Sequence, residues 1–90
     1  MKLQMLIKDV SVISADGDMS VEISGISYDS RRVKKGDVFV AMTGYETDGH
    51  KFIPDAIEAG AVAVICEREL DVGVATVVVP SSREALARMS

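Results

Sequence analysis

The chain has 90 residues and a formal net charge of −4, with 48% hydrophobic and 27% charged side chains. This length allows one small domain, and this balance of apolar and charged residues is typical of a folded globular protein. The acidic excess argues against nucleic acid as a partner, because nonspecific binding of that kind depends on neutralising phosphates. The sequence lacks an apolar stretch of the roughly 18 residues that cross a membrane. We therefore expect a cytoplasmic protein with neither nucleic-acid nor membrane partners.

The first segments of the chain predict a helix, a turn and a partly exposed strand. Residues Met1–Val10 favour a short amphipathic helix, because their apolar side chains recur at helical spacing. These apolar positions are Leu3, Leu6, Ile7 and Val10. A turn is expected at 15–18, and Val21–Tyr28 begins with the alternation of a half-exposed strand. Gly25 in that strand indicates a bulge or a close approach of another backbone.

Three later runs predict strands that are buried on both faces, because they lack a polar side: Val38–Met42, Val62–Cys66 and Ala75–Val79. Their separation by helix-length segments predicts an α/β fold, a small single domain with a mixed or parallel sheet flanked by short helices. The one cysteine, Cys66, lies within the second run. We interpret it as a small buried hydrophobic residue of a protein in a reducing compartment.

Two of the helices can be placed from their ends. Residues Pro54–Ala59 predict a short helix, since the proline suits a first turn and Gly60 can adopt a left-handed conformation after the last turn. Ser81 and Glu84 have the spacing of a capping box at the start of a final helix. That helix reaches Ser90 without a C-terminal cap, so we expect the chain to be cut within it.

Self-sufficient catalysis is not expected from this sequence. It contains neither a GxxxxGK[ST] phosphate loop nor a GxGxxG dinucleotide motif, and it has no GxSxG elbow. One histidine and one distant cysteine do not give the spacing of a metal site. We therefore predict neither catalytic nor metal-binding residues in this chain.

Two polar loops could bind a ligand. In the first, Tyr28-Asp29-Ser30-Arg31, the ring can pack on a base or sugar, the serine can hydrogen-bond, and the arginine can pair with phosphate. The alternative is a local turn in which Asp29 pairs with Arg31 or Arg32. The basic residues that follow are interpreted as a solvated loop. These are Arg31, Arg32, Lys34 and Lys35.

The second loop, Gly44-Tyr45-Glu46-Thr47-Asp48-Gly49-His50, follows a buried strand, at the edge where open α/β sheets tend to bind ligands. Its glycines allow close approach of the backbone, and its polar side chains supply donors and acceptors. His50 could act as a base, but no partnered nucleophile is visible in the sequence. A histidine that fixes the loop by hydrogen bonding is the favoured interpretation.

Taken together, these segments resemble the N-terminal domain of the Mur ligases of peptidoglycan synthesis. The resemblance rests on Gly25–Arg31, Val33–Ala41, Gly44–His50, Ala56–Ile57 with Gly60–Ala61, and the closing run Val79–Leu86. The form Gly-Tyr-x-Thr-Asp-Gly-His is most similar to the members that add the third residue of the stem peptide. Two alternatives stay open: a D-alanyl-D-alanine-adding member of the family, and a stand-alone, non-catalytic α/β binding module.

The resemblance implies that the domain holds the UDP part of UDP-MurNAc-L-Ala-D-Glu. The positions that it implies in contact with UDP are Tyr28, Ser30, Tyr45, Glu46 and Thr47. It makes Asp48, Gly49 and His50 less certain neighbours, and it leaves Asp29 and Arg31 to hold the first loop in shape.

The resemblance also implies a bacterial ligase with three domains, of which residues 1–90 are the first. A central domain would bind ATP and Mg²⁺, and a C-terminal domain would bind the incoming meso-diaminopimelate or L-lysine. ATP would phosphorylate the terminal carboxylate of the substrate, and the amine of the diamino acid would attack the acyl phosphate. The partners implied for this domain are the UDP-linked muramyl dipeptide and the other two domains, and it would itself bind no cofactor and supply no catalytic group.

Overall fold

The computed structural model describes residues 1–42 and 49–89, and these form a mixed five-stranded sheet with short helices on both faces. The strands are β1 (Ser14–Asp16), β2 (Gly25–Ser27), β3 (Asp37–Val40), β4 (Ala63–Cys66) and β5 (Ala75–Val78). Their order across the sheet is β1-β5-β4-β3-β2. Strands β2 to β5 pair in parallel, and β1 pairs with β5 in the antiparallel sense. The predicted α/β class and mixed sheet are confirmed.

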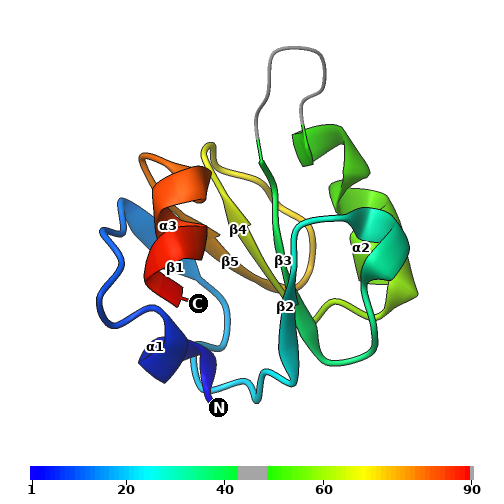
Figure 1. Ribbon diagram of the computed structural model, residues 1–90, viewed down its shortest axis with the longest axis horizontal. Helices are drawn as coiled ribbons and strands as arrows, with labels where there is room; N and C mark the ends of the chain where they lie inside the picture. Colours follow the sequence, from blue (N-terminus) through cyan, green and yellow to red (C-terminus); the bar gives the residue numbers. More distant parts are fainter. Residues whose placement is uncertain (43–48, 90) are drawn as a thin grey trace.

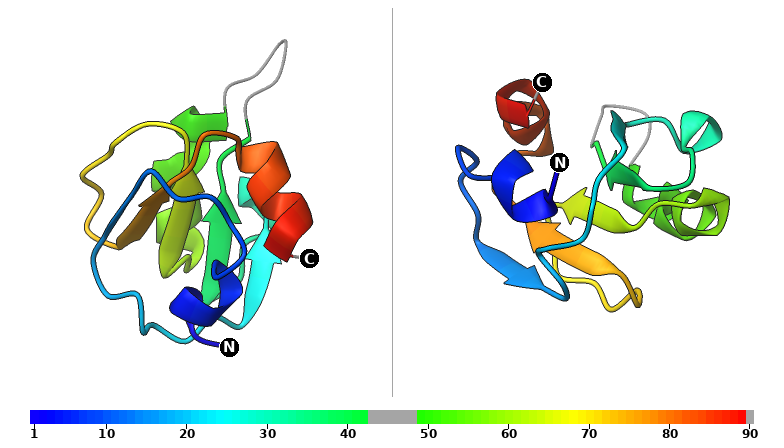
Figure 2. Two further views of the ribbon diagram at one scale, coloured as in Figure 1. Left: turned by 90° about the vertical axis from the view of Figure 1, so that its left-hand side faces the viewer. Right: turned by 90° about the horizontal axis from the view of Figure 1, so that it is seen from below.

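Three layers result from this arrangement (Figures 1 and 2). Helices α1 (Leu3–Leu6) and α3 (Ser82–Met89) cover one face of the sheet. Helix α2 (Ile53–Ala59) covers the other, together with the 3₁₀ turns η1 (Ser30–Arg32) and η2 (Gly49–Phe52). The two termini of the chain lie on the side of α1 and α3 (Figure 2).

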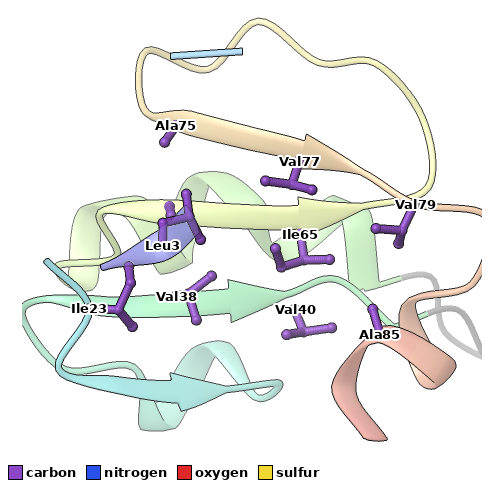
Figure 3. Close-up of a cluster of buried hydrophobic side chains, with 10 residues drawn as sticks. Leu3, Ile23, Val38, Val40, Ile65, Ala75, Val77, Val79 and Ala85 are labelled. Carbon is purple, nitrogen blue, oxygen red and sulfur yellow. The ribbon is translucent and has the colours of Figure 1, made fainter. Parts of the chain in front are cut away.

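Alternating side chains of the central strands feed two separate cores. Val38 and Val40 point toward α1 and α3, whereas Phe39 between them packs toward α2, as the pleat of a strand requires. Figure 3 shows the first cluster, in which Leu3 of α1 and Ala85 of α3 meet the strand residues. Every residue of β3, β4 and β5 is buried, which confirms the prediction of three central strands.

The predicted N-terminal helix is wrong in length. Residues 1–10 contain only the single turn α1, because Lys2 is extended and pairs with Glu22 in an isolated antiparallel bridge. The N–H of Leu3 donates to the carbonyl of Val21 at 2.9 Å, which ties the start of α1 to the neighbouring segment. The predicted apolar face still packs on the core of the α1 side through Leu3, Leu6, Ile7 and Val10.

Two further corrections concern the edge strands. Residues 14–16 form β1, where the sequence predicted only the beginning of a turn, because the open edge of β5 offers them a ladder of hydrogen bonds. The strand predicted over Val21–Tyr28 is limited to β2. Gly25 pairs in regular register with Asp37, and a side chain rather than another backbone lies close to it, since a Cβ there would be 2.9 Å from the Asp37 carboxylate.

The predicted C-terminal end of α2 and the predicted start of α3 are confirmed, while α2 begins one residue earlier than predicted, at Ile53. Gly60 follows α2 with φ of 124°, and a Cβ at this position would lie 2.6 Å from the Cα of Lys35. At the start of α3, the Ser81 hydroxyl accepts a hydrogen bond from the N–H of Glu84 at 3.2 Å. The carboxylate of Glu84 faces Arg88 one turn later, at 3.9 Å.

Candidate functional site

An open hollow of about 900 Å³ lies beside the edge strand β2. Its wall consists of β2, the η1 turn and the residues that lead into β3. Tyr28 lines it directly after β2, and the side chain of this tyrosine is 64% exposed. An exposed aromatic ring beside a hollow of this size can stack on a planar ligand.

The Asp29 carboxylate and the Arg31 guanidinium form a two-point ion pair at one side of the hollow. Arg31 donates to Asp29 through Nε and through a terminal nitrogen, each at 3.1 Å, and through its backbone N–H at 3.0 Å. These hydrogen bonds hold the pKa of Asp29 below its ordinary value, and the Asp29 carboxylate raises the pKa of Arg31. The pairing confirms the local-turn alternative for these two residues and makes Arg31 less available to a ligand.

Arg32 and Lys34 also line the hollow, and their charged ends are free of hydrogen bonds and ion pairs within the part of the chain that the structure describes. Both side chains are exposed. The buried carboxylate of Asp37 lies in the same wall, where it accepts the backbone N–H of Lys34 at 3.0 Å. The hollow therefore presents two positive groups that an anionic ligand could reach.

Ser30 is half-buried at the start of η1 and lies outside the lining of the hollow, although Tyr28 and Asp29 are part of it. The sequence analysis did not identify a role for the neighbouring Ser27. Ser27 is buried, and its hydroxyl donates to the carbonyl of Asp29 at 3.0 Å, so it supports the loop from below. Its inward orientation follows from the alternation of side chains along β2. The sequence predicted a longer strand, over Val21–Tyr28, and therefore did not reveal this orientation.

The second predicted loop is described only at its last two residues, Gly49 and His50. Its first five residues, Gly44, Tyr45, Glu46, Thr47 and Asp48, lie outside the described residues. Next to them, the N–H of Gly49 donates to the carbonyl of Met42 at 2.7 Å, just beyond β3. A Cβ on Gly49 would lie 2.5 Å from that same oxygen, so only glycine fits this contact without a shift of the backbone.

His50 fixes the structure at this edge of the sheet. Its side chain is only 6% exposed, and its Nε2 accepts the backbone N–H of Glu67 at 2.9 Å. Because this nitrogen is occupied by a backbone donor, it is not free to take a proton from a substrate. The interpretation of His50 as a residue that fixes its loop is confirmed.

Cys66 is fully buried, as predicted, and burial raises the pKa of its thiol. Within residues 1–42 and 49–89, no three histidine, cysteine or acidic side chains gather closely enough to hold a metal ion. Over the same residues, none of the helices has the length and apolar character to cross a membrane.

The fold and the hollow define a small α/β domain with an open hollow at one edge of its sheet, lined by Tyr28 and by three basic and two acidic residues. Residues 22–90 match the Mur ligase family, catalytic domain, and the chain belongs to this family.

Similar proteins narrow the relationship within the family. The chain is 50% identical, over its whole length, to the UDP-N-acetylmuramoyl-L-alanyl-D-glutamate--2,6-diaminopimelate ligase of Syntrophomonas wolfei. It is 40% identical over 98% of its length to the ligase of the same name from Bacteroides fragilis. The chain spans 19% of the length of each of these relatives. The resemblance to Mur ligases of this type is therefore confirmed.

A solved structure shares the fold. It is that of the UDP-N-acetylmuramoylalanyl-D-glutamyl-2,6-diaminopimelate--D-alanyl-D-alanyl ligase from Acinetobacter baumannii, with a TM-score of 0.86 and 31% identity. The match covers 97% of this chain and 20% of that one. The small domain described above is therefore a fold that occurs within a longer Mur ligase.

Proposed function

We propose that this domain binds the UDP part of UDP-MurNAc-L-Ala-D-Glu for a ligase that adds a diamino acid in peptidoglycan synthesis. One observation carries the proposal: the hollow beside β2 combines an exposed aromatic ring, Tyr28, with the positive charges of Arg32 and Lys34, which form no ion pair with another described residue. A nucleoside diphosphate has the complementary parts, a planar base and two adjacent anionic groups. The names of the 50% and 40% identical relatives support this choice of substrate.

The distribution of charge supports the hollow beside β2 as the nucleotide site, in preference to another hollow of the domain. A second hollow, of about 500 Å³, lies at the opposite edge of the sheet beside β1. Its charged lining residues are Asp16, Glu69 and Asp71. This acidic lining repels a diphosphate. Beside β2, the basic residues Arg31, Arg32 and Lys34 outnumber the carboxylates of Asp29 and Asp37, so the lining has a net positive charge that attracts it.

The proposed role of Tyr28 follows from its position in the hollow, where its ring would stack on the uracil or lie against the ribose. Ser30 lies outside the lining, so its proposed hydrogen bond to the nucleotide, from the start of η1, rests on the resemblance to the Mur ligases. Asp29 and Arg31 would keep the loop in shape through their ion pair. Contacts from Tyr45, Glu46 and Thr47 stay a prediction from the sequence, because those residues lie outside the described part of the chain.

In the complete ligase, this domain would contribute binding and orientation. Anchoring a distant nucleotide allows binding energy to place the reacting carboxylate against the groups that act on it. ATP with Mg²⁺ would activate that carboxylate in the central domain, and meso-diaminopimelate or L-lysine would be the amine substrate. The central and C-terminal domains are thus its proposed partners, and a bacterial cytoplasmic location stays a prediction.

One specific observation favours a second candidate, the ligase that adds D-alanyl-D-alanine. The solved structures with TM-scores of 0.86 and 0.87 are of that enzyme, from Acinetobacter baumannii. Their sequence identity to the chain is 31%, against 50% for the diaminopimelate-adding relative. We therefore favour the diaminopimelate-type ligase, and both candidates share the proposed UDP site.

Titration of the chain with UDP, followed by calorimetry or fluorescence, tests the proposed site. Tyr28→Ala should weaken UDP binding about tenfold, in line with the loss of one stacked base. Ile13→Ala is a matched control, because Ile13 is also an exposed apolar side chain, 66% exposed, next to the opposite edge strand. Equal affinities for Tyr28→Ala and the unsubstituted chain would remove Tyr28 from the site.

Ser30→Ala in the complete ligase tests the role of the serine. The substitution should raise KM for the UDP-linked substrate more than KM for ATP, because the proposed contact involves only the nucleotide of the former. Steady-state kinetics with each substrate varied in turn gives the comparison. Equal changes in both constants, or no change in either, would assign Ser30 a structural role only.

A further inference from the structure

Glu67, directly after β4, connects two segments that are far apart in the sequence. Its backbone N–H donates to Nε2 of His50 at 2.9 Å, and its carboxylate accepts the backbone N–H of Ser82 at 2.8 Å. His50 belongs to η2, and Ser82 is the first residue of α3. One residue therefore contacts both segments, through its backbone on one side and its side chain on the other.

These two segments belong to opposite layers of the domain. The η2 turn continues into α2 on one face of the sheet, and α3 lies on the other face (Figure 1). Between them runs β4, the middle strand of the five. Glu67 thus joins the two outer layers across the carboxyl edge of the sheet.

The chemistry of both contacts is well defined. A backbone N–H can only donate, so Nε2 of His50 must be unprotonated to accept it, which selects one neutral tautomer of this buried ring. At α3, the first N–H groups have no partner within the helix, and a carboxylate there also interacts favourably with the helix dipole. Ser82 is fully buried, so water cannot easily replace Glu67 as the acceptor.

The His50 side of the link leads toward β3. His50 follows Gly49, whose N–H is bonded to the Met42 carbonyl just beyond that strand. A displacement of Glu67 would therefore be transmitted through His50 to the end of β3, and through Ser82 to α3. Such a chain of hydrogen bonds can couple segments that do not touch each other.

We propose that Glu67 is a positioning residue that couples the η2 turn to the N-terminus of α3, so that both layers keep a fixed geometry at the carboxyl edge of the sheet. The coupling itself is a property of the domain. Its expected effect on UDP affinity rests on the function proposed above, because the nucleotide would then bind near an edge whose geometry Glu67 maintains.

The test uses Glu67→Ala, which removes the contact with Ser82 and leaves the N–H that bonds His50. Hydrogen exchange at the Ser82 amide should become about tenfold faster, as expected for losing a bond to a charged acceptor. The ring ¹⁵N signals of His50 and the Gly49 amide should shift as well, although neither touches the deleted atoms. UDP affinity should fall on the order of 3- to 10-fold.

Glu67→Gln keeps an oxygen acceptor and should restore most of the His50 signal and of the UDP affinity. Glu69→Gln is the matched control, because Glu69 is an exposed glutamate two residues further on, and it should change neither. If Glu67→Ala does not fold, Glu67→Asp, which shortens the side chain by one methylene, provides the same comparison.

A change confined to Ser82, with His50 and Gly49 unaffected, would overturn the coupling and leave Glu67 as a simple helix cap. Failure of the unsubstituted chain to bind UDP would contradict the proposed function instead. The His50 signal would still decide the coupling in that case, because it is measured without nucleotide.

Discussion

At the scale of single residues, the roles of charged side chains depend on which partner each one meets. The sequence placed Asp29 and Arg31 two positions apart and allowed either a local pair or a phosphate contact. The two-point ion pair between them supports the local pair and leaves Arg32 and Lys34 as the positive groups of the β2 hollow. Neighbouring basic residues of one short run therefore have different roles.

The Asp29 carboxylate should titrate at a lower pH than an ordinary aspartate, because its hydrogen bonds with Arg31 lower its pKa. The interaction is fully present above the pKa of the unfolded chain and is lost as the pH falls through the lowered, folded value. An NMR titration of the carboxyl carbon gives the midpoint, and Arg31→Gln should move it back upward. The same midpoint with and without Arg31 would contradict the pairing in solution.

Ser82 carries a hydroxyl that is fully buried and has no hydrogen-bond partner within the described residues. Ser82→Ala removes this unsatisfied group and keeps the N–H that donates to Glu67. The substitution should be neutral or should raise the free energy of unfolding by up to about 1 kcal/mol. Urea denaturation measures this change. A loss of more than about 1 kcal/mol would mean that the hydroxyl has a partner in solution.

At the scale of elements, burial decided which predictions succeeded. The strands β3, β4 and β5 are buried on both faces, so their continuous apolar runs identified them in the sequence. Strand β1 is short and mostly exposed, and its pairing with β5 involves backbone groups that are common to all sequences. Helix α1 is short for a similar reason, since the extended backbone at Lys2 depends on the distant Glu22.

Gly49 closes the segment that follows β3, and its requirement for glycine is one of space. A Cβ at Gly49 would lie 2.5 Å from the carbonyl oxygen and 2.7 Å from the nitrogen of Met42, both backbone atoms. Gly49→Ala should therefore lower the free energy of unfolding by about 1–3 kcal/mol, as overpacking commonly does. Urea denaturation again supplies the measurement.

Gly73→Ala is the control for that substitution. Gly73 has a positive φ of 79°, but nothing lies within 4 Å of its added Cβ, so only backbone strain of about 1 kcal/mol is expected. A Gly49→Ala variant as stable as Gly73→Ala would show that the backbone near Met42 can move aside.

At the scale of the whole molecule, the net charge of −4 does not describe how the charged side chains are distributed over the two edges of the sheet. The two edge strands, β1 and β2, lie at opposite ends of the sheet, one beside an acidic hollow and the other beside the hollow that contains Arg32 and Lys34. The apolar runs correctly predicted an α/β fold, but neither they nor the composition could show that Arg31, Arg32 and Lys34 gather at one edge of the sheet while the hollow at the other edge has only acidic charged residues in its lining.

The candidate site was predictable to the extent that its residues are adjacent in sequence. Tyr28 follows a strand and could be placed at its end from the pattern alone. The role of Glu67 could not be predicted, because it depends on the spatial proximity of His50 and Ser82, which are 32 positions apart in the chain (82 minus 50). Hydrogen bonds between residues so far apart in the sequence can be identified only in the folded structure.

The central claim is that the edge beside β2 binds UDP, and ¹H–¹⁵N spectra of the chain during a UDP titration test it most directly. Binding should be weak, in the millimolar range, because contacts from the rest of a ligase are missing. The amides predicted to shift are those of Tyr28, Ser30, Arg32 and Lys34. Those beside the acidic hollow should stay unchanged: Ser14, Asp16 and Thr76. Unchanged spectra at the β2 edge, or larger shifts beside β1, would contradict the account.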